Sequence, residues 1–313
     1  YKYLKEEFNA KLNLAQIQNP WFTQDNLKFC LEQWGEILTE ENLNNWVQNY
    51  SETNNPKNVG IIMAGNLPLV GFHDLISVLL SGHHAIGKTS SKDNILMGFV
   101  IDYLLEFETF KNSIQKVERL KNQDAVIATG SNNTARYFEY YFKEIPHIIR
   151  KNRTSIAVLN GDETAEDLRK LAEDIFRYFG LGCRNVTKLY LPKGFNTDLL
   201  FESFFEWKEV INHTKYANNY EYNRAIYLMG SEAFLDNNFV MLKESEELFS
   251  PIGVVNYEFY ENWDDVQNEL IQNEEKIQCI VGNDFEVKFG ETQKPSLTDY
   301  SDGVDVMAFL EKL

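Results

Sequence analysis

Residues 59–68, VGIIMAGNLP, place a short apolar run directly before a turn of glycine, asparagine and proline. An apolar run of this length is typical of a buried strand, and the turn leads into a helical pattern over 73–80. The same order returns at 125–132 and at 155–162, where apolar runs again end in turns of small and polar residues. Strands that alternate with helices in this way predict an α/β fold with a largely parallel sheet.

The third of these runs leads into the strongest helix signal in the chain. Thr164 and Asp167 have the spacing of a capping box, apolar residues from Leu168 to Phe179 share one helix face, and Gly180 is a natural stop. The large apolar residues before Tyr50 also have helical spacing, so we expect helices ahead of the first strand.

Two further runs, 225–229 and 277–282, predict strands in the last third of the chain. We expect acidic helical stretches around Glu244 and Asp264 to separate them. The turn at Gly182 is expected to open a short helical segment that follows Cys183.

The charge balance excludes several classes of partner. The chain carries 30 basic and 47 acidic residues, a formal net charge of −17, and a field of that sign repels phosphate backbones and anionic lipid. No run approaches the ~20 apolar residues that span a bilayer, and the first residues lack the apolar centre of a signal peptide. We therefore expect a soluble, cytoplasmic protein that binds neither nucleic acid nor membrane.

The three cysteines, Cys30, Cys183 and Cys279, are sparse and have no CxxC spacing, which indicates reduced thiols and no cysteine-rich metal site. Cys183 lies in the glycine-flanked turn 180–185, GLGCRN. Backbone N–H groups, the positive end of a helix and the neighbouring Arg184 would stabilise a thiolate there. The other interpretation of Cys183, a small buried hydrophobe, stays open, and packing is the role predicted for Cys30 and Cys279.

Residues 82–89, GHHAIGKT, match the phosphate-loop pattern GxxxxGK[ST] in full, so a P-loop nucleotide triphosphatase remains an alternative. That mechanism needs a strand before the loop and a helix after it. Residues 74–80, directly before Gly82, predict a helix instead. His83 and His84 point apart as neighbours and have no further ligands at suitable spacing, so no metal site is predicted.

In their order along the chain, these motifs resemble the aldehyde dehydrogenase superfamily. They are similar in particular to the acyl-CoA reductase family, which includes the reductase subunit of the bacterial luminescence fatty-acid reductase complex. The resemblance runs from about Val59 to the end, and the closing segment 294–310 looks especially like this branch. It implies N-terminal helices with a Rossmann-type cofactor lobe at 1–154, an α/β catalytic lobe with the cysteine at 155–290, and a segment at 291–313 that packs back on the core.

The resemblance also implies roles for single residues. Asn66 matches the asparagine that stabilises the substrate oxyanion, and Cys183 matches the nucleophile. The positions that match the family's cofactor contacts are Lys88 and Ser91 at the adenosine ribose, Thr129, Gly130 and Ser131 under the nicotinamide, and Glu247 and Phe249 around the nicotinamide ribose.

Two departures from the superfamily pattern indicate the reaction and the cofactor. Hydrolytic relatives carry a water-activating glutamate about where residues 149–153, IRKNR, stand here, and without that base an acyl-enzyme would resist hydrolysis. The three basic residues of this stretch either meet coenzyme A phosphates or are simply solvated. Ser91, with Lys92 beside it, replaces the glutamate that binds both ribose hydroxyls in NAD-preferring relatives, which favours NADPH over NADH.

The sequence thus predicts an acyl-CoA reductase that forms an aldehyde through an acyl-enzyme on Cys183 and hydride from NADPH. The alternatives are an aldehyde dehydrogenase that oxidises an aldehyde, the triphosphatase, and a partner-binding subunit without catalysis. We expect Asn66, Glu247 and Cys183 to converge on one cleft, and His73 is a candidate proton donor. The acyl donor is coenzyme A or an acylated partner such as an acyl-protein synthetase, and analogy with relatives predicts a homo-oligomer.

Overall fold

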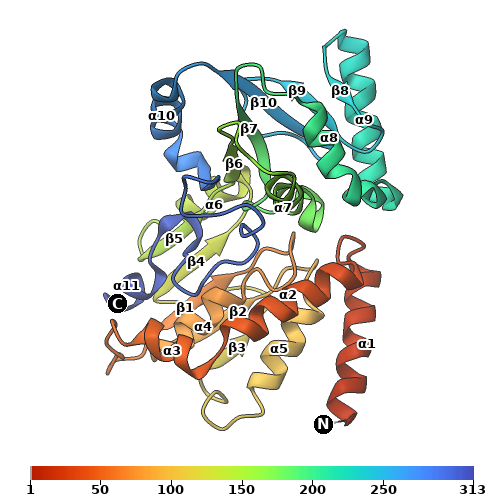
Figure 1. Ribbon diagram of the computed structural model, residues 1–313. Helices are drawn as coiled ribbons and strands as arrows, with labels where there is room; N and C mark the ends of the chain where they lie inside the picture. The colour runs from red at the N-terminus through yellow and green to blue at the C-terminus, as the bar shows by residue number, and fades with distance from the viewer. Residues whose placement is uncertain (1) are drawn as a thin grey trace. The chain divides into compact units, whose positions relative to one another are not determined.

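The computed structural model describes the backbone of residues 2–313 and the side chains from Glu6 onward. The chain divides into two compact units (Figure 1). Unit 1 contains the residues before Arg153 together with Ser296–Leu313, and unit 2 contains Arg153–Pro295. Each unit is built around its own largely parallel sheet with helices, which confirms the predicted α/β class.

Unit 1 has a five-stranded parallel sheet in the order β3-β2-β1-β4-β5. Its strands are β1 (Asn58–Ile62), β2 (His84–Lys88), β3 (Ile114–Lys116), β4 (Ala125–Thr129) and β5 (His147–Arg150). Its helices are α1 (Lys2–Gln18), α2 (Gln24–Ile37), α3 (Glu40–Val47), α4 (Phe72–Leu80), α5 (Leu96–Leu104), α6 (Asn132–Phe142), the short 3₁₀ turn η4 (Ser301–Gly303) and α11 (Val306–Leu310).

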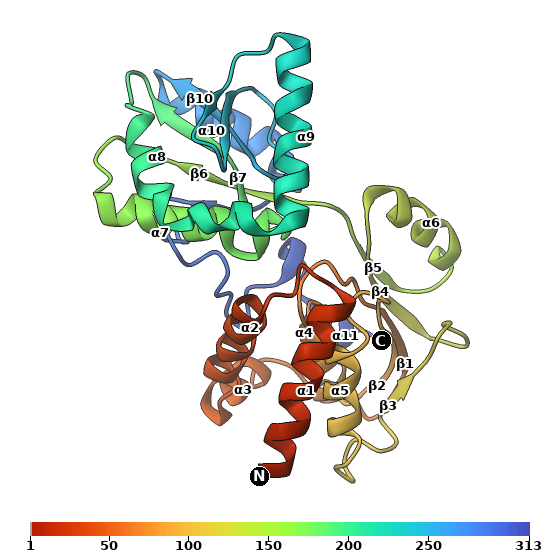
Figure 2. The ribbon, with the colours of Figure 1, turned by 90° about the vertical axis from the view of Figure 1, so that its right-hand side faces the viewer.

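The strand order of unit 1 follows from its connections. The chain leaves β1 through α4 to β2 on one side, and leaves β4 through α6 to β5 on the other. Because such crossovers are right-handed, α4 and α6 cover opposite faces of the sheet, as Figure 2 shows. Strands β1 and β4 are buried on both faces, which explains their unbroken apolar runs.

The closing segment belongs to unit 1, where α11 packs against α4. Buried His83 bridges the two parts of the chain, because its Nδ1 accepts from the Lys57 N–H at 3.0 Å and its Nε2 donates to the Leu310 carbonyl at 3.0 Å. Tyr300 accepts a 2.7 Å hydrogen bond from the Trp46 indole. These contacts fix residues 296–313 against the first sheet.

Unit 2 has a six-stranded sheet in the order β11-β6-β7-β10-β9-β8, parallel except for β8. Its strands are β6 (Thr154–Val158), β7 (Val186–Pro192), β8 (Leu235–Asp236), β9 (Met241–Glu244), β10 (Val254–Tyr260) and β11 (Ile277–Val281). Its helices are α7 (Ala165–Phe176), α8 (Asp198–Phe204), α9 (Thr214–Gly230), α10 (Trp263–Gln272) and the 3₁₀ segments η1 (Arg177–Gly180), η2 (Phe205–Asn212) and η3 (Glu274–Lys276).

Helices α7 and α10 cover the centre of this sheet. The predicted capping box is present at the start of α7, where the Thr164 side chain accepts from the Asp167 N–H and the Asp167 carboxylate accepts from the Thr164 N–H. Val266 and Leu270 of α10 pack with Tyr190 and the strand residues of one core cluster. Helices therefore pack on the sheet, and loops occupy the ends of its strands.

Several predicted elements were wrong. Residues 225–229 lie in α9, where Tyr227 is buried, rather than in a strand, and Glu244 ends strand β9 rather than lying in a helix. No helix follows Cys183; β7 begins at Val186. In each case a short apolar or acidic run carried no signal that separates helix from strand, and tertiary packing decided.

Candidate functional site

The predicted site residues of unit 1 share one edge of its sheet. Asn66 follows β1, Lys88 ends β2 with Ser91 in the loop beyond, and Thr129 ends β4 with Gly130 and Ser131 directly after it. In a parallel sheet these are all carboxyl ends, and the order β3-β2-β1-β4-β5 reverses between β1 and β4. Ligands of open α/β sheets bind at such a reversal, so the edge suits a dinucleotide.

The turn that carries Asn66 is packed closely against the loop after β2. Gly65 has no room for a side chain, since a Cβ there would lie 2.5 Å from the Ser90 Oγ and 2.7 Å from its Cβ. Asn66 itself is exposed on this turn. Its amide is therefore presented from a backbone that has little freedom to shift.

Two buried side chains fasten the same turn. Asn19 donates through Nδ2 to the carbonyls of Gly65 and Lys92, both at 3.4 Å. Asp93 accepts a 2.8 Å hydrogen bond from the Leu69 N–H and is 4% exposed. Burial raises the pKa of Asp93 to about 7, although the backbone N–H groups near it act in the opposite direction. Asn19 and Asp93 therefore tie the turn of Asn66 to the loop of Ser91.

The turn after β4 opens helix α6, an eleven-residue helix. Ser131 is its N-cap and accepts from the Thr134 N–H at 3.3 Å. A Cβ on Gly130 would meet the side chains of Thr134 at 3.1 Å and Phe138 at 3.2 Å, so a larger residue would be tightly packed there. A glycine turn that leads into a helix N-terminus favours the negative charge of a dinucleotide, so these residues fit a nicotinamide cofactor.

The phosphate-loop interpretation of residues 82–89 is wrong. His84–Lys88 form strand β2, whose backbone pairs with β1 on one side and β3 on the other. N–H groups committed to a sheet cannot cradle phosphates. The helix α4 ends at Leu80, directly before the motif, where a phosphate loop requires a strand.

The basic stretch 149–153 begins inside β5, and each of its three charged side chains has a protein partner. Arg150 is 6% exposed and makes a bidentate ion pair with Asp74 of α4, at 2.5 and 2.7 Å. Lys151 pairs with Glu139 at 2.9 Å, and Arg153 donates to the Ile277 carbonyl at 3.0 Å. Arg150 is therefore engaged within the protein, whereas Lys151 lies exposed at the surface, as the solvated interpretation expects.

His73, the candidate proton donor, packs inside unit 1. Its Nε2 donates to the Leu297 carbonyl at 2.9 Å, and its ring lies 5.1 Å from that of Trp46 and 5.7 Å from that of Tyr300. This arrangement favours a role in holding the closing segment rather than in proton transfer.

In unit 2 the thiol lies at the amino edge of the sheet. Cys183 is half-buried in the turn Gly182–Asn185, closed by a 3.1 Å hydrogen bond from the Asn185 N–H to the Gly182 carbonyl. The Ser155 hydroxyl, at the start of β6, donates to the Cys183 carbonyl at 3.0 Å. The backbone of Cys183 is thus hydrogen-bonded directly to strand β6.

Asn185 organises the turn from within. It is fully buried, and its Oδ1 accepts from the Gly182 N–H at 2.8 Å. Its Nδ2 faces the last carbonyls of α7, including that of Arg177 at 2.7 Å. The helix end nearest Cys183 in the chain is therefore the carbonyl end of α7, and the expected stabilisation of the thiolate by a helix N-terminus was wrong.

The segment that enters the turn has an uncommon backbone. Tyr178, Phe179 and Gly180 have φ values of 55°, 59° and 75°, and such values are uncommon for bulky side chains. Both aromatic residues are buried, and the Phe179 ring lies 4.4 Å from that of His213. Packing thus holds a strained stretch directly before the thiol, a place where strain commonly accompanies function.

Glu247 and Phe249 lie at the same amino edge, in the loop between β9 and β10. Both side chains are exposed, whereas Leu248 between them is buried in the core cluster. Asn256 of β10 donates to the carbonyls of Glu247 and Phe249 at 2.8 and 3.2 Å. Cys183 and this loop therefore belong to one edge of one sheet.

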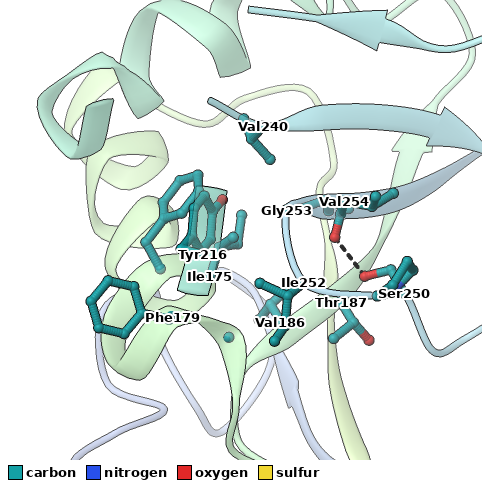
Figure 3. Close-up of a pocket in the computed structure, with 14 residues that line it drawn as sticks. Ile175, Phe179, Val186, Thr187, Tyr216, Val240, Ser250, Ile252, Gly253 and Val254 are labelled. Carbon is teal, nitrogen blue, oxygen red and sulfur yellow. Dashed lines mark hydrogen bonds between the residues drawn. The ribbon is translucent and has the colours of Figure 1, made fainter. Parts of the chain in front are cut away.

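A narrow apolar pocket opens beside this edge (Figure 3). Its walls come from the end of α7, the start of β7 and the segment 250–255, and they include Phe179, Tyr216 and Ile252. The pocket has room for about one water molecule, so an acyl chain would enter only if side chains moved. Tyr216 of α9 is one of its buried walls.

Two absences apply to the described part of the chain. Among these residues, no three His, Cys, Asp or Glu side chains are grouped as a metal ion requires. In the same residues, no helix is long and apolar enough to cross a bilayer.

The sequence patterns identified candidate residues at the carboxyl edge of the first sheet and at the amino edge of the second. They missed the buried polar residues that hold these loops. Asn185 stood in the quoted turn without a role, and Asn19, Asp93 and Asn256 carried no motif at all. A polar residue within an apolar strand pattern is the signal that could have identified such a buried residue. Asn256, which stands among apolar residues in β10, has this signal.

The sequence model of the family described as acyl-CoA reductase (LuxC) matches residues 2–198, which include Asn66, Lys88 and Cys183. The match ends before Glu247 and Phe249. No curated protein sequence matches this chain.

Solved structures with a similar fold are aldehyde dehydrogenases. Aldehyde dehydrogenase 21 from Physcomitrella patens, in complex with the product succinate, is 12% identical with a TM-score of 0.64, over 99% of this chain and 81% of that one. Staphylococcus aureus AldH in a substrate-bound state is 14% identical with a TM-score of 0.59, over 87% and 70%. These likenesses confirm the predicted aldehyde-dehydrogenase-like fold.

The indole-3-acetaldehyde dehydrogenase AldA of P. syringae, in complex with NAD⁺, is 13% identical with a TM-score of 0.56. The similarity covers 68% of this chain and 53% of that enzyme, so the chain spans about half of its length.

Proposed function

The chain belongs to the acyl-CoA reductase (LuxC) family, and from that premise we propose that it transfers an acyl group from a thioester to Cys183 and reduces it to an aldehyde. The observation that carries the proposal is the half-buried thiol on a turn held by Ser155 and Asn185. A reactive side chain on a fixed, accessible turn is what nucleophilic catalysis requires.

In the first step the Cys183 thiolate attacks the thioester carbonyl carbon, and the bond from that carbon to the coenzyme A sulfur breaks. The departing thiolate takes up a proton. We assign the stabilisation of the tetrahedral oxyanion to the Asn66 amide and the Cys183 backbone N–H. Such donors contribute roughly 3 kcal/mol each in other enzymes.

Reduced nicotinamide, when bound, supplies the hydride that brings the enzyme thioester to the aldehyde level. The resulting thiohemiacetal on Cys183 collapses to aldehyde and regenerates the thiolate, so each acyl group consumes one hydride and one proton. The residues that we assign to hold the cofactor are Lys88, Ser91, Thr129, Gly130, Ser131, Glu247 and Phe249.

The loop after β2 supports NADPH as the preferred form. Ser91 and Lys92 are exposed there, and the carboxylate of that loop, Asp93, is buried against the Leu69 N–H. No carboxylate of residues 89–93 is therefore presented to a ribose, and a 2′-phosphate would meet no repulsion from this loop.

The buried pair of Arg150 and Asp74 supports aldehyde over acid as the product. Hydrolytic relatives place a water-activating glutamate near this position, whereas the Asp74 carboxylate at this strand end has both oxygens bonded to Arg150. A carboxylate engaged in this way does not act as a base. The acyl group on Cys183 would thus persist until it meets a thiol or a hydride.

We propose that the donor is coenzyme A or an acylated partner such as an acyl-protein synthetase, and that the chain self-associates. The exposed aromatic face of α6 supports association, because Tyr137, Tyr140 and Tyr141 are 66%, 71% and 73% exposed. Exposed aromatic groups of this kind are enriched at protein interfaces.

The test uses labelled acyl-CoA and the absorbance of NADPH. Wild-type protein should acquire a thioester-linked label without nucleotide and should oxidise NADPH when both are present. Cys183→Ala should do neither, while Cys279→Ser, which keeps a polar atom beside Ser155, should do both. Retention of acyl-CoA-dependent NADPH oxidation by Cys183→Ala would refute the nucleophile.

A further inference from the structure

The loop that carries Glu247 and Phe249 is held by polar side chains of the strands beneath it. Lys188 of β7 donates to the Ser245 carbonyl, and Thr187 donates to the Leu248 carbonyl at 2.6 Å. Asn256 of β10 donates both amide hydrogens, to Glu247 O at 2.8 Å and to Phe249 O at 3.2 Å.

Lys188 and Asn256 are buried, and burial of a polar side chain lowers stability unless its hydrogen bonds are made. Lys188 is 0% exposed and Asn256 is 3% exposed, and the two residues are direct neighbours in the pairing of β7 with β10. A buried amide is tolerated when its hydrogens are bonded, and here the acceptors are carbonyls of the loop. Buried polar side chains of the sheet are thus hydrogen-bonded to the backbone of the irregular loop 245–249.

The same set of contacts reaches the thiol turn. The Thr187 hydroxyl lies 2.5 Å from that of Thr154, and Thr154 Oγ1 also approaches the Asn185 carbonyl at 3.5 Å. Asn185 in turn holds Gly182, the residue before Cys183. Contacts of Thr187 and Thr154 with backbone carbonyls therefore lead from the loop of Glu247 to the turn of Cys183.

We propose that Asn256 is a positioning residue that sets Glu247 and Phe249 for the nicotinamide ribose in register with the Cys183 turn. The inference rests on the proposed function. A hydride donor must lie close to the acyl carbon on the thiol, and sites of this kind need supporting residues that hold geometry to within about 0.5 Å. Asn256 touches neither reactant and acts through the backbone of the loop.

The test compares Asn256→Leu, which keeps the number and branching of the side-chain heavy atoms and loses both hydrogen bonds, with Thr187→Val, which loses the bond to Leu248. Asn223→Leu is the matched control. Asn223 of α9 donates through Nδ2 to the Ile252 carbonyl at 3.0 Å, a bond of the same kind to the same loop, but beyond residues 245–249 that Lys188, Thr187 and Asn256 hold. All three are made in the full chain.

Three readouts separate positioning from general structure: NADPH binding by fluorescence titration, the rate of acyl labelling of Cys183 without nucleotide, and the melting temperature. Asn256→Leu should raise the Kd for NADPH about tenfold, and Thr187→Val about threefold. Acyl labelling should stay within about twofold of wild type in both, since that step needs no cofactor. Asn223→Leu should leave the Kd unchanged.

An unchanged Kd in Asn256→Leu and Thr187→Val would overturn the inference. So would a parallel loss of labelling, binding and melting temperature, or an equal effect of Asn223→Leu, because each indicates a structural role only. If Asn256→Leu fails to fold, Thr187→Val decides. Wild-type protein that neither binds NADPH nor takes up label refutes the proposed function itself, and the inference then falls with it.

Discussion

Replacing Arg150 by methionine tests whether the basic stretch 149–153 is structural. Arg150 and Asp74 are 6% and 3% exposed and share two hydrogen bonds. Removal of one partner leaves a charge buried without compensation, which typically costs about 3–5 kcal/mol. We expect Arg150→Met and Asp74→Leu each to lower the free energy of unfolding by that amount.

The double variant Arg150→Met/Asp74→Leu is the control, since it removes both charges and keeps apolar volume. Replacement of a complete buried pair is often close to neutral, so the double variant should be more stable than either single one. Urea unfolding of the full chain, followed by circular dichroism, measures all four proteins. A single variant that costs less than about 1 kcal/mol, with a raised KM for acyl-CoA, would return Arg150 to a phosphate-binding role.

Two further predictions concern the cofactor and pH. Ser91→Glu should shift the ratio of kcat/KM for NADPH and NADH at least about tenfold toward NADH, because a carboxylate there binds ribose hydroxyls and repels a 2′-phosphate; an unchanged ratio would remove Ser91 from the site. Burial raises the pKa of Asp174 from 3.8 to about 6, so the folded chain holds this proton more tightly than the unfolded chain. This proton contributes about 3 kcal/mol to the free energy of unfolding below pH 3.8, and the contribution is lost as the pH rises to about 6. Asp174→Asn should therefore flatten the fall of the free energy of unfolding with pH, measured by urea titrations.

Strands β1 and β4 of the first unit follow from the sequence pattern, whereas residues 84–88, 114–116 and 147–150 were not predicted as strands from their residues. Strands with unbroken apolar runs, such as Val126–Ala128, are buried on both faces and alternate with helices, and right-handed connections then leave few topologies. The phosphate-loop motif gave a wrong prediction because a short sequence match does not show whether the backbone pairs with neighbouring strands. Once Gly87 lies in a strand between two neighbours, its N–H belongs to the sheet.

The candidate site was predictable only for the residues that would touch reactants. Cys183 and Glu247 lie in motifs whose chemistry depends on residue type and spacing. The residues that hold their backbones, such as Asn185 and Asn256, are chosen by a single tertiary contact, and any small polar residue at that position has the same local pattern. Sequence patterns report local periodicity, and these contacts join residues from separate strands.

The two edges that carry the candidate site share one physical device. On each edge an exposed or half-buried side chain stands on an irregular loop, and buried polar side chains bond the peptide groups of that loop. These are Asn19 and Asp93 beneath Asn66, Asn185 beneath Cys183, and Asn256 beneath Glu247. Buried polar groups lower stability unless every bond is made, so they favour one loop geometry over many. A loop supported in this way gives a reactive side chain a fixed position while it remains accessible to a substrate, which packing alone does not achieve for an exposed residue.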